Sequence, residues 1–334
     1  MRQNLKTQNH KNSGISTTIM INPAKKKDLE KQGYRLVGNH SAIKACHWTK
    51  KSLKNQGTCY KQRFYNIKAH RCVQMTPSLP YCTLRCKWCW RDIEHTIPEW
   101  VGPIDAPKDI IKGCIKEHVK YLQGFGGNKK ASKQKFNEAK QPMHFAISLA
   151  GEPTLYPRLP ELIQELHKQG ITSFLVTNAT NPAMLRKLSQ NPPSQLYITL
   201  PAPNEKIFKE MCSPLIRDGW ERILESLKIM RESKDKTRTT IRLTLAKDKN
   251  MLLPEQYAEL IKIAEPKFIE CKAYMHVGYS KNRMSIKNMP AHSEIRSFSE
   301  EIARHTGYKY IDEQKASRVV LLMKEDSKDR EMNF

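Results

Sequence analysis

The stretch TPSLPYCTLRCKWCWRD, residues 76–92, carries three cysteines in the spacing C-x3-C-x2-C. They are Cys82, Cys86 and Cys89. A structural zinc ion takes four protein ligands in a closed site, often as two C-x2-C pairs. A [4Fe–4S] cluster held by only three thiolates leaves one iron open to bind another molecule. Because no fourth cysteine follows closely, the motif favours such a cluster over structural zinc.

The surrounding sequence alternates between strand-like runs and segments with helical apolar spacing. The runs are 71–79, 143–150, 172–178, 195–202, 239–247 and 268–275, and the helical segments include 158–170, 181–191, 219–233 and 253–265. This alternation predicts an α/β fold with a parallel sheet. Six units are too few for an eight-stranded barrel, so we expect a partial, TIM-like (β/α)6 barrel or a doubly wound sheet. In both, the chemistry lies at the carboxyl ends of the strands, where the cysteine motif falls.

Composition divides the chain into four parts. We expect a basic mobile tail over 1–27, a cysteine-bearing, RNA-facing extension over 28–75, the partial barrel over 70–280 and a C-terminal extension over 281–334. The last part holds one predicted helix, about 290–305, and a final strand, 317–323. Within the barrel, the basic segment 126–140 is predicted to be a solvated loop.

The chain of 334 residues has a formal net charge of +25. Residues 1–75 hold 16 Lys and Arg against two acids, a local charge of +14. This excess favours an anionic polymer as partner, and nucleic acid over a membrane surface. No apolar run of 18 residues and no secretory signal is present, so we expect no membrane span and a reducing, cytoplasmic setting. There, nine cysteines indicate metal binding or catalysis rather than disulfides.

A C-x3-C-x2-C motif after a first strand resembles the signature of radical S-adenosylmethionine (SAM) enzymes. The resemblance implies that the open iron binds the amino and carboxylate groups of SAM, which one electron then cleaves to a 5′-deoxyadenosyl radical. Gly151-Glu152-Pro153 ends the second strand, where that family has a GGEP-like motif, with Ala150 replacing the first glycine. Further candidates for the SAM site are Thr177 and Asn178, which end the third strand, and Trp88, which either packs on the adenine or buries the cluster.

A second set of cysteines precedes the motif in the basic extension. Cys46, Cys59 and Cys72 have the spacing C-x12-C-x12-C, and three more thiolates are enough for a second [4Fe–4S] cluster with an open iron. The remaining cysteines fall in helix or strand patterns and are predicted to be packing residues; they are Cys114, Cys212 and Cys271.

The cysteine triplet directly before the radical motif resembles the tRNA 4-demethylwyosine synthases. Further matching stretches are 70–92, 176–182, 214–227, 242–251, 268–284 and 317–322, so that the resemblance covers about residues 30–323. The chain resembles the shorter, archaeal-type form without a flavodoxin-like domain. It departs from the family at Pro201, where an acidic residue is usual.

The resemblance implies a reaction and its partners. N1-methylguanosine-37 of a tRNA, usually the phenylalanine tRNA, condenses with pyruvate to give 4-demethylwyosine, a tricyclic base, at the expense of SAM. The N1-methyl group has no acidic proton, so a radical is needed and the cofactor performs the difficult step. We expect two [4Fe–4S] clusters, an external one-electron donor and a monomeric enzyme.

Two groups compete to hold pyruvate. Lys61 stands two residues after Cys59, where the family has a lysine proposed to form a Schiff base with the ketone. Burial or neighbouring cations would lower its pKa, with Arg63, Lys68 and Arg71 as the expected cations. The rival is the open iron of the second cluster, acting as a Lewis acid on the carboxylate and ketone. The sequence leaves both open.

The loop after the sixth strand is the expected contact with RNA or substrate, through Tyr279, Ser280, Lys281 and Arg283. Two other functions remain possible at this stage. A radical SAM enzyme acting on a small metabolite or peptide explains the first motif but neither the charge nor the second triplet. A zinc-stabilised RNA-binding protein explains the charge but neither the Gly151-Glu152-Pro153 stretch nor the six βα units.

Overall fold

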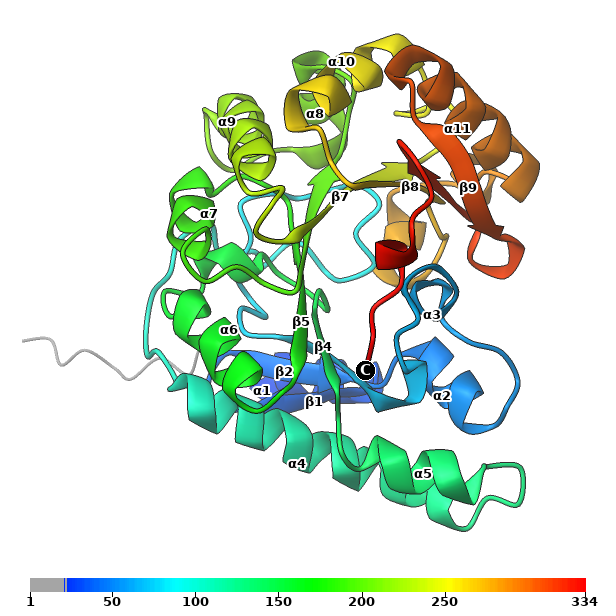
Figure 1. Ribbon diagram of the computed structural model, residues 1–334. Helices are drawn as coiled ribbons and strands as arrows, with labels where there is room; N and C mark the ends of the chain where they lie inside the picture. Colours follow the sequence, from blue (N-terminus) through cyan, green and yellow to red (C-terminus); the bar gives the residue numbers. More distant parts are fainter. Residues whose placement is uncertain (1–20, 22) are drawn as a thin grey trace, which may run out of the picture.

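Six parallel strands form the centre of a ten-stranded sheet in the computed structural model, which describes residue 21 and residues 23–334 (Figure 1). The strands are β3 (Cys72–Thr76), β4 (His144–Ile147), β5 (Thr172–Thr177), β6 (Gln195–Leu200), β7 (Arg238–Leu245) and β8 (Phe268–Ala273). They lie side by side in chain order. A doubly wound sheet reverses its order at a switch point. The fold is therefore the partial (β/α)6 barrel, and all six predicted strands are confirmed.

Antiparallel strands extend the sheet on both sides of this centre. β1 (Tyr34–Val37) and β2 (Ser41–Lys44) form a hairpin beside β3, and β10 (Val319–Met323) and β9 (Lys309–Gln314) follow β8. In the described part of the chain β1 and β9 are the two edges, so the sheet does not close into a barrel. The sequence predicted β10 but neither the hairpin nor β9.

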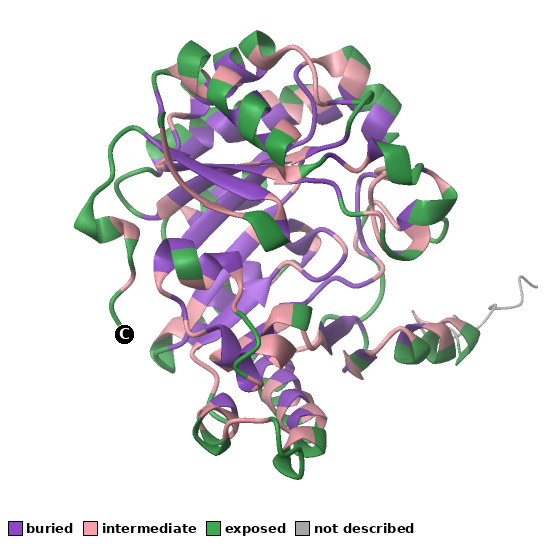
Figure 2. Ribbon diagram, turned by 90° about the vertical axis from the view of Figure 1, so that its right-hand side faces the viewer, coloured by how far each residue is buried: buried purple, intermediate pink, exposed green. Residues whose placement is uncertain are grey.

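Helices cover the outer face of the sheet, where α4 packs on α6, α7 on α9, and α10 on both α9 and α11 (Figure 1). Figure 2 shows the sheet largely buried and the outer helices exposed on the side away from it. The helices are α1 (Pro23–Lys31), α2 (His47–Leu53), α3 (Tyr60–Tyr65), α4 (Pro107–Gly126), α5 (Lys133–Ala139), α6 (Leu159–Lys168), α7 (Pro182–Leu188), α8 (Glu205–Cys212), α9 (Gly219–Glu232), α10 (Pro254–Ala264) and α11 (His292–Thr306). Every predicted helix is present. No helix among the described residues is long and apolar enough to cross a lipid bilayer.

The inner face of the sheet encloses an aromatic cluster that is separate from the main core. Side chains alternate between the faces of a strand, so residues two apart share the inner face. Phe174, Tyr197 and Phe268 lie on that face and pack with Phe64 and Tyr65 of α3. The short helix α3 thus fills the lumen of the partial barrel, and it brings its own polar side chains there.

Two expectations about the flexible parts of the chain need correction. The segment 126–140 is not simply a solvated loop, because residues 133–139 form α5, which Ser132 caps by accepting a hydrogen bond from the Lys135 amide at 3.3 Å. Phe136 and the buried Ala139 hold α5 in a small apolar cluster with Leu122 of α4. The tail predicted over 1–27 does not extend over 23–27, which are part of α1; residues 1–20 and 22 lie outside the described residues.

Candidate active site at the rim of the sheet

The three motif cysteines lie in the loop that follows β3, at the carboxyl ends of the parallel strands. Cys82 is buried, Cys86 and Cys89 are half-buried, and all three line one cavity of about 380 Å³. Burial raises the pKa of the Cys82 thiol to about 12, while the guanidinium of the buried Arg91 opposes the rise. Burial also raises the pKa of Cys89, again against Arg91. A cation beside the thiols suits a site that must hold them as thiolates.

The chemistry of this donor set fits an iron–sulfur cluster. Among the described residues no three Cys, His, Asp or Glu side chains are gathered closely enough to hold a single metal ion. The thiolates of a cluster bind separate irons, so they are spread more widely than the ligands of one ion. Three thiols on one cavity wall, a buried cation and no fourth cysteine in the wall match a three-thiolate cluster.

The Gly151-Glu152-Pro153 stretch packs directly against the cysteine loop. Gly151 has φ +69°, and a Cβ atom there would lie 2.0 Å from the carbonyl oxygen of Ser78 and 2.7 Å from that of Tyr81. The amide of Glu152 donates to the same Tyr81 oxygen at 2.7 Å. Only glycine permits so close an approach of two backbones. Ala150, which replaces the family glycine, is buried.

Glu152 joins the ends of two neighbouring strands. Its buried carboxylate accepts hydrogen bonds from the Thr177 hydroxyl at 2.6 Å and from the Asn178 amide at 2.7 Å. Asn178 in turn donates through Nδ2 to Thr83 at 3.1 Å and to the Cys82 sulfur at 3.7 Å. Glu152, Thr177 and Asn178 therefore lie together as predicted, and they line the cavity with Gly151 and Trp88, whereas Pro153 does not.

Replacing Gly151 by alanine is expected to destabilise this rim. The new methyl group meets two carbonyl oxygens and the backbone must keep a left-handed conformation, so we expect a loss of about 2–5 kcal/mol in the free energy of unfolding. Gly170→Ala is the matched control, because Gly170 has φ +68° with no atom near the added Cβ. The control should lose only about 1 kcal/mol. Equal losses in denaturant titrations of the two variants would show that the close backbone contact is unimportant.

The second cysteine set surrounds the lumen helix α3. Cys46 precedes α2, Cys59 precedes α3, and Cys72 begins β3. All three are half-buried. Burial raises the pKa of Cys59 to about 11 and of Cys72 to about 12, and each thiol is also influenced by Cys46. The thiols are thus close enough to act on one another electrostatically, as three ligands of one cluster must be.

Lys61 of α3 is buried in the lumen. Its Nζ lies 4.1 Å from the centroid of the Tyr197 ring and 4.8 Å from that of Phe174. Burial, followed by repulsion from Arg242, lowers the pKa of Lys61 to about 8, against the opposing effect of Glu270. The expected loss of proton affinity is therefore present: burial is its main cause, and the cation that adds to it is Arg242 of β7.

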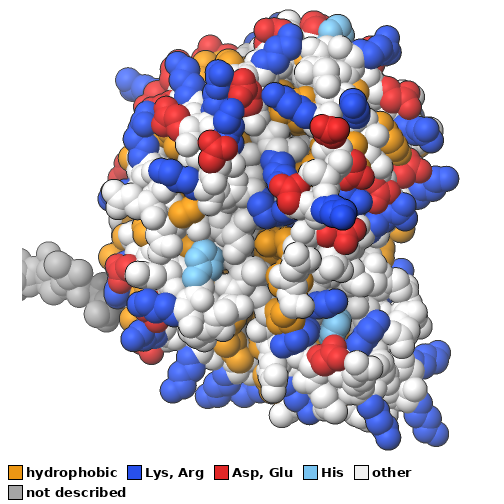
Figure 3. All heavy atoms as spheres, in the orientation of Figure 1, with side chains coloured by type: hydrophobic (Ala, Val, Ile, Leu, Met, Phe, Trp, Pro, Cys, Tyr) orange, Lys and Arg blue, Asp and Glu red, His pale blue; other side chains and the backbone are white. Residues whose placement is uncertain are grey.

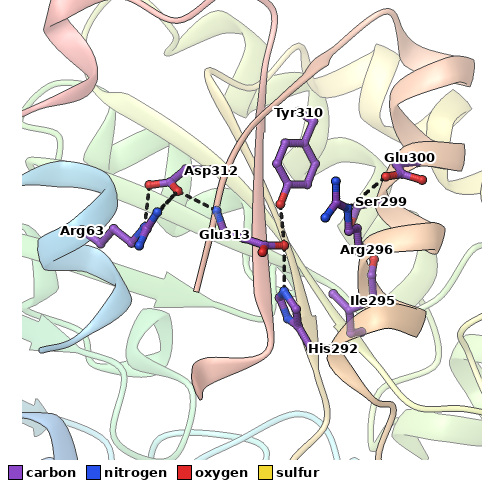
Figure 4. Close-up of polar contacts among 9 residues, drawn as sticks. All are labelled: Arg63, His292, Ile295, Arg296, Ser299, Glu300, Tyr310, Asp312 and Glu313. Atoms are coloured by element: carbon purple, nitrogen blue, oxygen red, sulfur yellow. Dashed lines mark hydrogen bonds and ion pairs between the residues drawn. The ribbon is translucent and has the colours of Figure 1, made fainter. Parts of the chain in front are cut away.

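Two of the cations expected to help Lys61, Arg63 and Arg71, are engaged with other residues. Figure 4 shows Arg63 turned toward Asp312 of β9, and its guanidinium donates to both carboxylate oxygens at 2.7–2.9 Å. Beyond it, Tyr310 and His292 meet at Glu313 and join β9 to α11. Arg71 donates to the Gln141 carbonyl at 2.9 Å. Arg63 therefore fastens α3 to β9.

The loop after β8 holds the cysteine loop. The guanidinium of Arg283 donates to the carbonyls of Lys87, Cys89 and Arg91. The amide of Tyr279 donates to the Trp90 carbonyl at 2.9 Å, and a Cβ on Gly278 would lie 2.3 Å from that same oxygen.

This position changes the expectation for the four residues predicted to contact RNA. Ser280 is fully buried and its hydroxyl donates to the Val277 carbonyl at 2.6 Å. Tyr279 is half-buried, and its hydroxyl donates to Asp28 at 3.2 Å. Arg283 and Ser280 thus serve the structure of the rim, and Lys281 is the exposed cation of this loop.

Four charged residues of the site were missed by the sequence analysis: Arg91, Arg242, Glu270 and Lys272. Arg242, Glu270 and Lys272 point into the lumen from neighbouring strands, and Arg242 and Lys272 line the same cavity as the motif cysteines. The sequence did contain an indication of the last three, because charged residues are rare in strands whose other residues are apolar enough to be buried. Pro201 also lines the cavity, and its carbonyl accepts from Asn250 at 2.8 Å.

Comparison with known proteins agrees with this geometry. Residues 76–264 match the radical SAM superfamily and residues 263–324 match the family described as "Wyosine base formation". The S-adenosyl-L-methionine-dependent tRNA 4-demethylwyosine synthase of Pyrococcus horikoshii is 48% identical over 317 residues, 92% of each chain. The synthase of Methanocaldococcus jannaschii is 38% identical over 312 residues, 90% of this chain and 96% of its own.

Solved structures give the same result. The structure described as "Structure of TYW1 with a lysine-pyruvate adduct bound" superposes with a TM-score of 0.83 at 37% identity, over 94% of this chain and 99% of the other. "Crystal structure of archaeal TYW1" has a TM-score of 0.76 at 34% identity, over 93% and 100%. The chain belongs to the family of S-adenosyl-L-methionine-dependent tRNA 4-demethylwyosine synthases.

Proposed function

We propose that the protein condenses N1-methylguanosine-37 of a tRNA with pyruvate to give 4-demethylwyosine. As a family member it is a radical SAM enzyme of wyosine-base formation in tRNA. The observation that carries the specific reaction is the cavity in which the three motif cysteines face Arg242 and Lys272, above the lumen that holds Lys61. In this arrangement the proposed SAM site and the proposed site for a small oxo acid open into the same cavity.

We assign two [4Fe–4S] clusters, to Cys82, Cys86 and Cys89 and to Cys46, Cys59 and Cys72. With SAM bound, the first cluster supplies one-electron chemistry that removes a hydrogen atom from an unactivated methyl group. The electron comes from an external donor, and the enzyme works as a monomer. Glu152 and Asn178 set the cavity wall beside Cys82, and Trp88 adds an aromatic surface to it.

We assign Lys61 as the group that takes the ketone of pyruvate. Its neutral amine attacks the carbonyl carbon, and water leaves as the imine forms. Two observations support this choice over the open iron of the second cluster. Lys61 is buried between aromatic rings, where an amine is poorly solvated, and a relative 37% identical carries a lysine–pyruvate adduct.

Basic surfaces support RNA as the large substrate. Figure 3 shows Lys and Arg along the lower edge of the molecule, over α4 and α5. The outer residues of these two helices include Lys112, Lys120 and Lys133. We propose that residues 28–75 and the exposed Lys281 also face the tRNA, while 70–280 act as the catalytic barrel and 281–334 as the extension that supports it. A loop nucleotide is unstacked at little cost and is able to enter the cavity.

The defining experiment follows the nucleoside. Reduced protein with both clusters is incubated with SAM, pyruvate and tRNA methylated at N1 of guanosine-37, and digested nucleosides are analysed by mass. We expect 4-demethylwyosine, with 5′-deoxyadenosine formed alongside. Omission of pyruvate should remove the tricycle. If SAM is cleaved but the tricycle never appears with any methylated tRNA, the protein is a radical SAM enzyme with a different substrate.

A further inference from the structure

Positive charge gathers in the lumen around one carboxylate. Arg242 of β7 and Glu270 of β8 are register partners, and Lys272 stands two residues further along β8 on the same inner face. The Arg242 side chain has only 16% of its surface exposed, and the Glu270 side chain has none. Lys61 reaches this region from α3. Three cationic side chains therefore surround Glu270.

Glu270 is already committed to other partners. One oxygen accepts from the Tyr65 hydroxyl at 2.8 Å, and the other accepts from Tyr60 at 3.0 Å and from Arg242 at 2.8–3.0 Å. Its charge is thus neutralised chiefly by Arg242. Among the described residues neither Lys61 nor Lys272 forms an ion pair with a carboxylate, and the charged form of each is costly in a poorly solvated lumen.

Two rings link the three cations in space. The Tyr197 centroid lies 4.1 Å from Lys61 Nζ and 4.8 Å from Arg242 Cζ. The Tyr60 centroid lies 5.9 Å from Arg242 Cζ and 5.6 Å from Lys272 Nζ. Arg242 thus stands between the two lysines. Lys272 donates to the Ser317 carbonyl at 2.6 Å, which fixes its position without neutralising its charge.

Arg242 and Lys272 also reach open space, because both line the cavity that the motif cysteines share. Within the described residues, Arg242 Nη1 makes no hydrogen bond to another residue, so this one nitrogen of the guanidinium is available to a ligand. A guanidinium nitrogen with free hydrogens next to an ammonium group supplies two charged donors, one for each oxygen of a carboxylate.

We propose that Arg242 and Lys272 form a carboxylate site, which binds the carboxylate of the 2-oxo acid while Lys61 takes its ketone. This inference rests on the proposed function, since it assigns the recognition of the small substrate. It explains why two cationic side chains, Arg242 and Lys272, line the cavity beside the lysine that is assigned to the ketone. It also predicts specificity: a neutral ester or amide of the same oxo acid should bind poorly.

The test measures pyruvate capture on Lys61, which requires neither SAM nor tRNA. Protein with its clusters is incubated with pyruvate over a range of concentrations, the imine is reduced with cyanoborohydride, and the adduct on Lys61 is quantified by peptide mass. Methyl pyruvate serves as the neutral probe. Wild-type protein should prefer pyruvate strongly. For Lys272→Met we expect the pyruvate concentration for half-maximal labelling to rise about 10- to 100-fold, the effect of losing one charged hydrogen bond.

Controls separate recognition from folding and cluster binding. Lys272→Arg should restore much of the preference, and Lys262→Met, an exposed lysine of α10, should behave as wild type. Iron is measured on every variant. If Lys272→Met labels with the wild-type preference, or regains affinity only when its iron is restored, Lys272 is not a carboxylate ligand. If Lys272→Met fails to fold, the affinity of Lys272→Arg and of Lys272→Gln decides the matter in the same way.

The failure of the proposed function gives a different pattern. In that case wild-type protein, too, forms no adduct on Lys61 with pyruvate and no tricyclic nucleoside. Loss of the preference for pyruvate over methyl pyruvate in the Lys272 variant alone, with wild-type capture intact, supports the carboxylate site. Capture by wild type and variant without any preference overturns the site and leaves the proposed function standing.

Discussion

Replacing Cys82, Cys86 and Cys89 together by alanine is expected to abolish both SAM cleavage and tRNA modification. The three thiols line the rim cavity beside Glu152 and Asn178, so their loss should remove the cluster that we propose there and with it the open iron for SAM. We expect 5′-deoxyadenosine to fall to the level without protein and iron to fall from about eight to about four per chain. Anaerobic reconstitution, iron analysis and chromatography of the nucleosides measure these changes.

A packing cysteine provides the control for this experiment. Cys114 of α4 is fully buried in the main core and does not line the rim cavity, so Cys114→Ala should keep its iron and its activity. SAM cleavage by the triple variant at a rate near that of wild type would remove the basis of the radical SAM assignment at these residues.

Replacing Cys46, Cys59 and Cys72 by alanine is expected to separate SAM cleavage from product formation. This set surrounds α3 and Lys61 rather than the Glu152 loop, so the first cluster and the SAM site should persist. We expect about four irons per chain and continued 5′-deoxyadenosine formation, but no 4-demethylwyosine. The same iron analysis and nucleoside masses report the result.

The matched control is Cys271→Ala on β8, whose buried thiol belongs to the core outside the lumen. Continued formation of the tricycle by the Cys46, Cys59 and Cys72 variant would show that a second cluster has no part in handling substrate. Loss of all iron would show instead that the two sites depend on each other for assembly.

The sequence predicted the parallel centre of the fold well, because buried parallel strands and amphipathic helices have strong periodic patterns. It missed β1 and β2, which have only four residues each, and β9, whose residues are all half-buried or exposed. It also missed α5, where Ser132 and Phe136 were present but hidden by the surrounding lysines. The lysine-rich composition of 126–140 had led to the prediction of a solvated loop, whereas packing of α5 against α4 makes part of the segment helical.

Site residues that belong to a sequence motif or end a predicted strand could be identified from the sequence. Site residues that come together only through the pairing of two strands could not. The cysteine motif, Gly151, Glu152 and Asn178 were found from their positions at strand ends. Arg242 and Lys272 were not, because only the register of β7 on β8 brings them together. In the same way Arg283 was assigned to RNA for its charge, whereas its guanidinium is turned to the cysteine loop.

The hydrogen bonds from the loop after β8 to the loop after β3 affect the order in which the protein can fold and receive its cluster. The carbonyls of Lys87 and Arg91 meet Arg283 only once nearly 200 further residues have been synthesised and folded, as the sequence separations of 196 and 192 show. On the ribosome, the nascent motif therefore emerges without the clamp that shapes it. Ordering of the motif loop for cluster insertion therefore has to wait for the loop after β8, and a truncated protein ending before Arg283 would lack the contacts that hold its motif loop in place.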